Sequence, residues 1–194
     1  MKAFRMVFCL LILINLVFDI NPVSAGISPD SKPYPETNGK AVILMDANSG
    51  RVLYERNSQQ QLPPASLTKI MTGLLVVENG DLNQKVTISE HAAETPECTV
   101  YLESGEVLTR MELLYAAMLP SANDASMALA ESIAGDEASF VELMNKRAGQ
   151  LGLKNTHFLN PHGLGVEGHY SSAYDLALLS KKALSYPVLA QVTE

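Results

Sequence analysis

Cysteine is scarce in this sequence, and so are basic residues. Only two of the 194 residues are cysteines, and 14 Lys and Arg stand against 21 Asp and Glu, for a net charge of −7. Cys9 lies inside an N-terminal apolar run, which leaves Cys98 unpaired and excludes a disulfide framework downstream of that run. We expect Cys98 to be a small buried hydrophobic residue, with a reactive thiol as the alternative. The acidic balance argues against a nucleic-acid partner.

Long apolar runs are absent after the first 25 residues. Lys2 and Arg5 precede the apolar stretch Met6–Phe18, and the small-residue pattern at 23–25 follows it. This order predicts a secretory signal peptide over residues 1–25 and therefore an exported protein. The apolar run is shorter than the roughly 20 residues that span a bilayer, although an uncleaved N-terminal anchor is the alternative. Residues 26–39, rich in Pro, Ser and Asp, are predicted to be a linker.

The rest of the chain, residues 40–194, reads as one domain without repeats or low-complexity tracts. Two short apolar stretches around a Gly-terminated turn predict a β-hairpin over 41–45 and 51–54. Capping signals and apolar periodicity predict helices over 66–78, 109–118, 125–134, 136–151 and 172–184. A hairpin followed by several helices indicates an α/β (α+β) fold, in which the hairpin needs further strands or helices as neighbours.

Ser66 and Lys69 form an S-x-x-K tetrad at the expected start of the first helix. Side chains three residues apart share a helix face, and the positive end of a helix favours a developing alkoxide while disfavouring an ammonium. The pair therefore has the geometry of a serine nucleophile with its own lysine base. Such a tetrad occurs by chance in a chain of this length, and a simple helix N-cap role for Ser66 is the alternative.

Ser121 and Asn123 lie in a break between two predicted helices, just after Pro120. A turn at this point can direct a hydroxyl and an amide into a cleft, although both residue types are also ordinary turn residues. S-x-x-K followed by S-x-N is the signature of the penicillin-binding proteins and serine β-lactamases.

The sequence around these motifs resembles the low-molecular-mass D-alanyl-D-alanine carboxypeptidases from about Lys40 to the end of the chain. The matching segments, in order, are PASLTKIMT at 64–72, SANDA at 121–125, NTHFLNPHGL at 155–164 and HYSSAYDLA at 169–177. The resemblance implies a fold like that of β-lactamases and penicillin-binding proteins. It would comprise a helical subdomain plus the N-terminal β-hairpin of an otherwise missing antiparallel sheet. Residues 40–194 would then be a partial D,D-peptidase catalytic domain.

The resemblance also implies roles for four side chains. Ser66 would attack the carbonyl between the two terminal D-alanines of a peptidoglycan stem peptide, forming an acyl-enzyme, and Lys69 would accept its proton. Ser121 would relay a proton to the leaving amine, and Asn123 would bind the substrate backbone and orient Lys69. β-Lactams would be covalent inhibitors, and the site of action would be the cell envelope.

No cofactor or metal is implied. The three histidines His157, His162 and His169 fall in a predicted loop without the i, i+4 spacing of helical zinc ligands. We therefore expect structural or surface roles for them.

The third family motif, K-T-G, does not occur in the 194 residues. The family uses that strand to hold the substrate carboxylate and to supply an oxyanion donor, whose loss costs about 10²- to 10³-fold in rate. From this we expect an N-terminal portion or a truncated product, with weak or no activity alone. Membrane association through a missing C-terminal segment stays open.

Other functions remain as alternatives. A D,D-endopeptidase would use the same catalytic residues, and a non-catalytic peptidoglycan- or β-lactam-binding remnant would need none of them. A class A β-lactamase is disfavoured because no E-x-x-L-N segment follows S-x-N, and Glu167 lies within EGHY instead.

Overall fold

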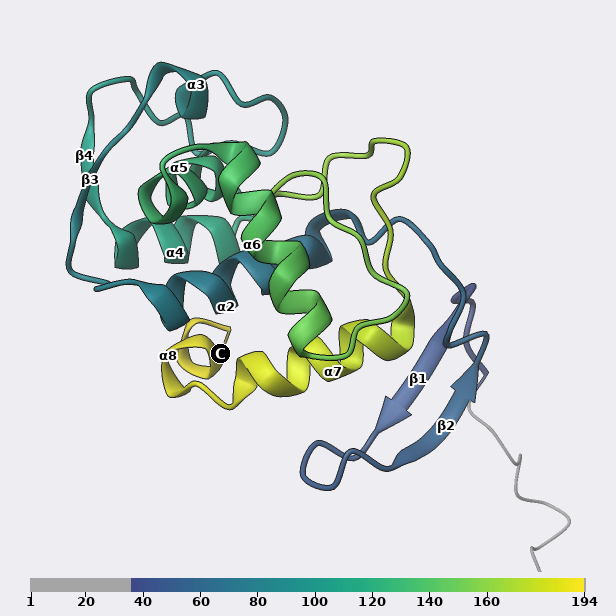
Figure 1. Cartoon of the computed structure of the whole chain (residues 1–194). Helices are drawn as coiled ribbons and strands as arrows, with labels where there is room; N and C mark the ends of the chain where they lie inside the picture. Colours follow the sequence, from purple (N-terminus) through teal and green to yellow (C-terminus); the bar gives the residue numbers. More distant parts are fainter. Residues whose placement is uncertain (1–35, 194) are drawn as a thin grey trace, which may run out of the picture. The chain divides into compact units, whose positions relative to one another are not determined.

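The computed structural model describes residues 36–193. The predicted signal peptide and most of the predicted linker lie outside the described residues. The elements of Figure 1, in chain order, are β1 Val42–Met45, β2 Val52–Arg56, η1 Ala65–Thr68 (a 3₁₀ helix), α2 Lys69–Asn79, β3 Lys85–Thr87, α3 Glu90–Ala93, β4 Val107–Thr109, α4 Arg110–Met118, α5 Asn123–Ala134, α6 Glu137–Gln150, α7 Ala173–Leu184 and α8 Pro187–Val192.

The predicted β-hairpin is confirmed. β1 and β2 pair antiparallel, and the turn between them is closed by the Asp46 carboxylate, which accepts the Ser49 N–H at 2.7 Å. Gly50 ends this turn with a left-handed φ of 76°, which glycine adopts without strain. A two-stranded hairpin is marginal by itself. Here β1 packs against α7, and Lys181 of that helix donates to the Asn48 carbonyl at 3.0 Å.

The predicted helix caps are formed as expected. Thr109 and Glu112 make both hydrogen bonds of a capping box at the start of α4. Asp136 caps α6 by accepting from the Ser139 N–H, and Ser172 caps α7 by accepting from the Asp175 N–H. Local sequence thus sets where these three helices begin.

Helix α2 is the centre of the fold, and it contacts each helix from α4 to α8. One core cluster gathers Met71 and Leu74 of α2 with Phe140, while a second gathers Val76 with Leu129. Apolar side chains on more than one face of α2 are therefore buried, as its heavily apolar sequence predicts. The element that begins at Lys69 is consequently held from several sides.

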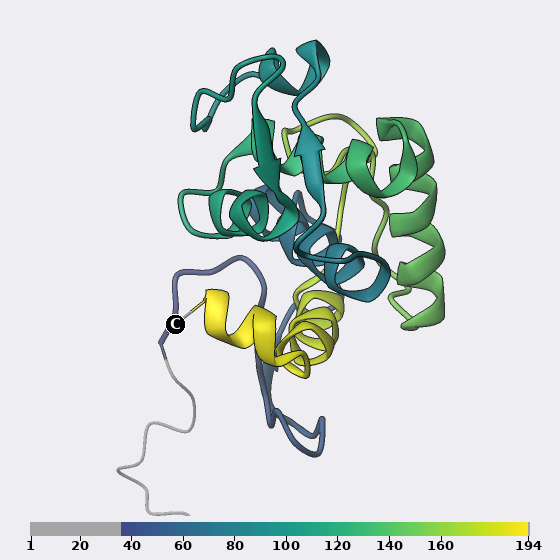
Figure 2. The ribbon, with the colours of Figure 1, turned by 90° about the vertical axis from the view of Figure 1, so that its left-hand side faces the viewer.

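Some elements were not expected from the sequence. β3 and β4 form a second antiparallel pair, which the sequence did not reveal because each strand has only three residues and α3 lies between them. Helix α7 is followed by α8, which begins at Pro187, a residue suited to the first position of a helix. Figures 1 and 2 place β3 and β4 beside α4 and α5, at the end of the fold opposite β1 and β2.

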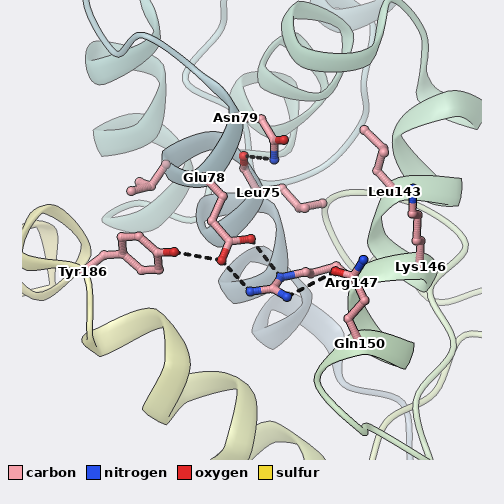
Figure 3. Close-up of a pocket in the computed structure, with 9 residues that line it drawn as sticks. Leu75, Glu78, Asn79, Leu143, Lys146, Arg147, Gln150 and Tyr186 are labelled. Atoms are coloured by element: carbon pink, nitrogen blue, oxygen red, sulfur yellow. Dashed lines mark hydrogen bonds and ion pairs between the residues drawn. The ribbon is translucent and has the colours of Figure 1, made fainter.

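The C-terminal end of α2 is tied to its neighbours by a polar cluster shown in Figure 3. Arg147 of α6 donates to both carboxylate oxygens of Glu78, at 2.8 and 2.6 Å. Tyr186, just before α8, donates to the same carboxylate at 2.9 Å. The cluster joins three helices at the end of α2 that is remote from Ser66.

Candidate active site

Ser66 lies in the 3₁₀ turn η1, immediately before α2. We expected the α-helix to begin at Ser66, but α2 begins three residues later, at Lys69. Residues three apart are eclipsed on a 3₁₀ helix, so Ser66 and Lys69 still face the same side. The Ser66 side chain does not cap α2, whose N-cap is Thr68 and which has no side-chain cap. Ser66 is exposed, so its hydroxyl is open to a substrate.

Ser66, Lys69 and Ser121 line one hollow of about 440 Å³. The rest of its wall is largely apolar and includes Leu67, Ile70 and Met118. Residues that are 55 positions apart in the sequence thus meet at one cavity, as the motifs predict.

Lys69 is almost fully buried, with 3% of its surface exposed. Its Nζ donates to Asn123 Oδ1 at 2.8 Å and to the backbone carbonyl of His162 at 2.9 Å. Burial lowers the pKa of the Lys69 amine from 10.5 to about 8, while the smaller electrostatic effect of the nearby Cys98 acts in the opposite direction. A large fraction of this amine is therefore neutral at mildly alkaline pH, as a proton acceptor must be.

Asn123 is the first residue of α5, and its side chain is oriented by partners on both sides. Its Oδ1 accepts from Lys69, its Nδ2 donates to the Pro96 carbonyl at 3.0 Å, and its backbone N–H donates to the Cys98 carbonyl at 2.7 Å. The amide is thereby fixed with its oxygen toward Lys69, and its second N–H has no acceptor within residues 36–193.

Ser121 has a left-handed backbone with a φ of 63° in the break between α4 and α5. Its Oγ is shielded from solvent and has no hydrogen-bond partner among the described residues. Buried hydroxyls normally find a partner, so an orphan hydroxyl at a cavity that also holds Ser66 and Lys69 calls for a functional explanation.

A match to the family model of the D-alanyl-D-alanine carboxypeptidases, peptidase S11, extends over residues 28–194. The chain belongs to this family. D-alanyl-D-alanine carboxypeptidase DacF of Bacillus subtilis is 44% identical over 94% of the chain and 49% of its own length. A D-alanyl-D-alanine endopeptidase of Pseudomonas aeruginosa is 33% identical over 94% of the chain and 61% of its own length. The crystal structure of penicillin binding protein 6B from Escherichia coli matches with a TM-score of 0.79 and 36% identity, covering 86% of the chain and 56% of that protein.

The fold is that of the penicillin-binding proteins, with helices and small antiparallel sheets, as the resemblance implied. The chain spans about half the length of the curated relatives it matches.

The loop after α6 contributes groups to this carboxypeptidase-family site that were not predicted from the sequence. The loop supplies two backbone carbonyls. The His162 carbonyl accepts from Lys69, and the Pro161 carbonyl accepts from Thr72 of α2 at 2.6 Å. Backbone carbonyls carry no sequence signal of their own, because every residue has one. The available hint was Gly163 after Pro161, a pattern typical of a tight turn.

Two of the three histidines have structural roles in this loop. Leu159 N–H donates to Nδ1 of His169 at 3.2 Å, so the neutral ring carries its proton on Nε2 and donates it to Thr68 Oγ1 at 2.9 Å. Burial lowers the pKa of His169. Burial, followed by the charges of Lys69 and His169, lowers the pKa of His162 to about 4. Both rings are therefore neutral near pH 7.

The expectation for Cys98 is wrong, because this residue is exposed. It lies in the loop before β4 with a φ of 28°, next to Glu97 at 60°. The Cys98 carbonyl accepts from the Asn123 N–H at 2.7 Å, so the backbone is held at the start of α5 while the residue stays exposed. Tertiary demands on the backbone thus override the usual preference of cysteine for the interior.

Within residues 36–193, no group of three or more His, Cys, Asp or Glu side chains is arranged to hold a metal ion. None of the helices in that same part of the chain combines the length and the apolar character that a membrane span requires.

Proposed function

We propose that the protein is a serine-type D-alanyl-D-alanine carboxypeptidase that acts on peptidoglycan stem peptides in the bacterial cell envelope. The observation that carries this proposal is the buried Lys69 amine, held by Asn123 beside an exposed Ser66 in a shared hollow. Membership of the family and the high identity to DacF support the same substrate class. Ser66 and Lys69 would form the acylating pair, with Ser121 and Asn123 as their partners.

In the acylation step, the Ser66 hydroxyl would attack the carbonyl carbon between the two terminal D-alanines while the neutral Lys69 amine takes the hydroxyl proton. The C–N bond of the resulting tetrahedral intermediate then breaks. The leaving amine of the last D-alanine receives a proton, which Ser121, at the same hollow, would relay from Lys69. D-alanine departs and an ester to Ser66 remains.

In the deacylation step, water attacks this ester carbonyl and the shortened stem peptide leaves with the new carboxylate. The Ser66 oxygen takes up a proton, which restores the free enzyme. β-Lactams would acylate Ser66 by the same attack and stay bound as covalent inhibitors. The second side-chain N–H of Asn123, which has no acceptor among the described residues, would bind a substrate carbonyl.

A D,D-endopeptidase is the second candidate, favoured by the 33% identity to the Pseudomonas aeruginosa endopeptidase. It would cleave cross-links with the same four side chains. The two functions are separated by supplying the full-length protein with a stem pentapeptide and with a cross-linked dimer. Release of free D-alanine from the pentapeptide at the higher kcat/KM supports the carboxypeptidase. Preferential cleavage of the dimer overturns that choice, and cleavage of neither overturns both.

A further inference from the structure

The Lys69 amine has two hydrogen-bond acceptors among the described residues, and this number suits a neutral base. A neutral amine has two N–H bonds and one lone pair, whereas an ammonium has three N–H bonds and no lone pair. With both N–H bonds directed at Asn123 Oδ1 and the His162 carbonyl, the lone pair of a neutral Lys69 must point elsewhere. The position of each acceptor therefore controls the direction in which Lys69 can accept a proton.

The second acceptor belongs to the backbone, and the side chain of Asn160 fixes that backbone. Asn160 Oδ1 accepts from the N–H of His162 at 3.3 Å and from the N–H of Gly163 at 2.6 Å. Asn160 Nδ2 donates to the Leu164 carbonyl at 2.9 Å. Asn160 is 8% exposed, so water cannot readily replace these three bonds. One side chain thus closes the whole turn from residue 160 to residue 164.

The same turn is pressed against the active-site helix. Thr72 holds the Pro161 carbonyl, and Gly163 packs on Ala65 with no space for a Cβ. The His162 carbonyl lies between these two fixed points. A change in the turn is therefore transmitted to Lys69 rather than absorbed by a loose loop.

We propose that Asn160 is a positioning residue for Lys69, which acts by holding the His162 carbonyl as the second acceptor of the Lys69 amine. The inference rests on the proposed acylation of Ser66. Asn160 does not touch the reacting atoms. It determines whether the lone pair of Lys69 faces the Ser66 proton and keeps water away from the amine.

A second asparagine in the same region provides a matched control. Asn145 of α6 also makes three hydrogen bonds through its side chain, to the backbone of Phe158 twice and to the Val141 carbonyl. It fastens the same loop, but at a point four residues before His162. A role in loop stability alone predicts similar effects for both asparagines, whereas a role in positioning Lys69 predicts an effect for Asn160 only.

The test compares Asn160→Ala and Asn145→Ala with the parent in the full-length protein. The rate of acylation by a fluorescent penicillin is measured from pH 6 to pH 10, and the Lys69 pKa is read from the Cε chemical shift by NMR. Opening the turn hydrates the amine, and burial is the first cause of its lowered pKa. For Asn160→Ala we therefore expect the acylation rate to rise at a higher pH than in the parent. Its maximal value should be at least about tenfold lower, because small misplacements of a catalytic group are costly. Asn145→Ala should keep the parent profile.

Thr72→Val, which removes the hydroxyl bond to Pro161 but keeps the side-chain shape, is the second variant in case Asn160→Ala fails to fold. It should shift the profile in the same direction by a smaller amount. The inference is overturned if the Lys69 titration is unchanged in Asn160→Ala or, where that variant does not fold, in Thr72→Val. It is equally overturned if Asn145→Ala shifts the titration as much. Should the parent not be acylated at Ser66, the proposed function fails, while the Lys69 titration still decides the role of Asn160.

Discussion

Gly163 lies directly against the backbone of Ala65, the residue before the proposed nucleophile. A Cβ at position 163 would overlap the Ala65 carbonyl and come within 2.9 Å of Thr68 Oγ1. Gly163 also has a φ of 91°, in the region that favours glycine, and Ala65 has a φ of 49°. The loop after α6 and the turn that carries Ser66 are therefore shaped by each other.

Gly163→Ala should consequently destabilise the fold and impair the site together. The side chain meets backbone atoms, which cannot move aside cheaply, and the left-handed backbone adds strain, so we expect a loss of about 2 kcal/mol or more in the free energy of unfolding. Gly165→Ala is the control, because nothing lies within 4 Å of the corresponding Cβ and its φ is not left-handed. Urea unfolding and penicillin acylation measure the two effects. Equal stability of the two variants would contradict the tight contact.

Ser121→Ala should separate stability from activity. The Ser121 hydroxyl has no partner among the described residues, so its loss should change the free energy of unfolding by less than about 0.5 kcal/mol. If Ser121 relays the proton, acylation should fall by about 10²-fold or more. Ser126→Ala, in the helix α5 that follows Ser121, is the matched control, since Ser126 Oγ donates to the Ala122 carbonyl and Ser126 does not line the hollow. This control should lose stability with little change in acylation, and the opposite pattern would remove Ser121 from the mechanism.

The neutral histidines predict a loss of stability in acid. His162 has a pKa of about 4 in the fold against 6.5 when exposed, so the unfolded chain binds the proton more readily between these values. The free energy of unfolding should therefore fall as pH decreases from about 6.5 toward 4. The loss for His162 should be on the order of 2 to 3 kcal/mol, because one pKa unit corresponds to about 1.4 kcal/mol.

Urea unfolding at pH 7 and pH 4.5 measures this loss. His162→Gln should reduce the difference between the two pH values, whereas the same change at the exposed His91 should leave it in place. A His162→Gln variant as acid-sensitive as the parent would contradict the assignment.

The sequence predicts most of this architecture where the determining interactions are local. A four-residue pattern predicts the capping box of Thr109 and Glu112, and both of its hydrogen bonds are present. Ser66 and Lys69 also lie within one turn, so their shared face follows from the spacing. The meeting of Lys69 with Asn123 was inferred only from resemblance, and the structure brings the two side chains to 2.8 Å.

The unpredicted features depend on contacts between distant segments. The pairing of β3 with β4 joins segments about 20 residues apart and involves three residues on each side. The carbonyl of the exposed Cys98 accepts from the Asn123 N–H, 25 residues away, and the second acceptor of Lys69 is a backbone oxygen 93 residues away. The type of a residue does not indicate which distant backbone group it will contact.

The most direct test of the account locates the covalent adduct of a fluorescent penicillin by peptide mass spectrometry and follows its rate of formation against pH. The pKa of Lys69 is lowered to about 8, and the base must be neutral to take the Ser66 proton. The account predicts a single adduct on Ser66, formed at a rate that rises with pH to a plateau above about pH 8, and no adduct in Lys69→Ala. An adduct on another residue, or an undiminished rate in Lys69→Ala, would contradict the assignment of Ser66 and Lys69 as nucleophile and base.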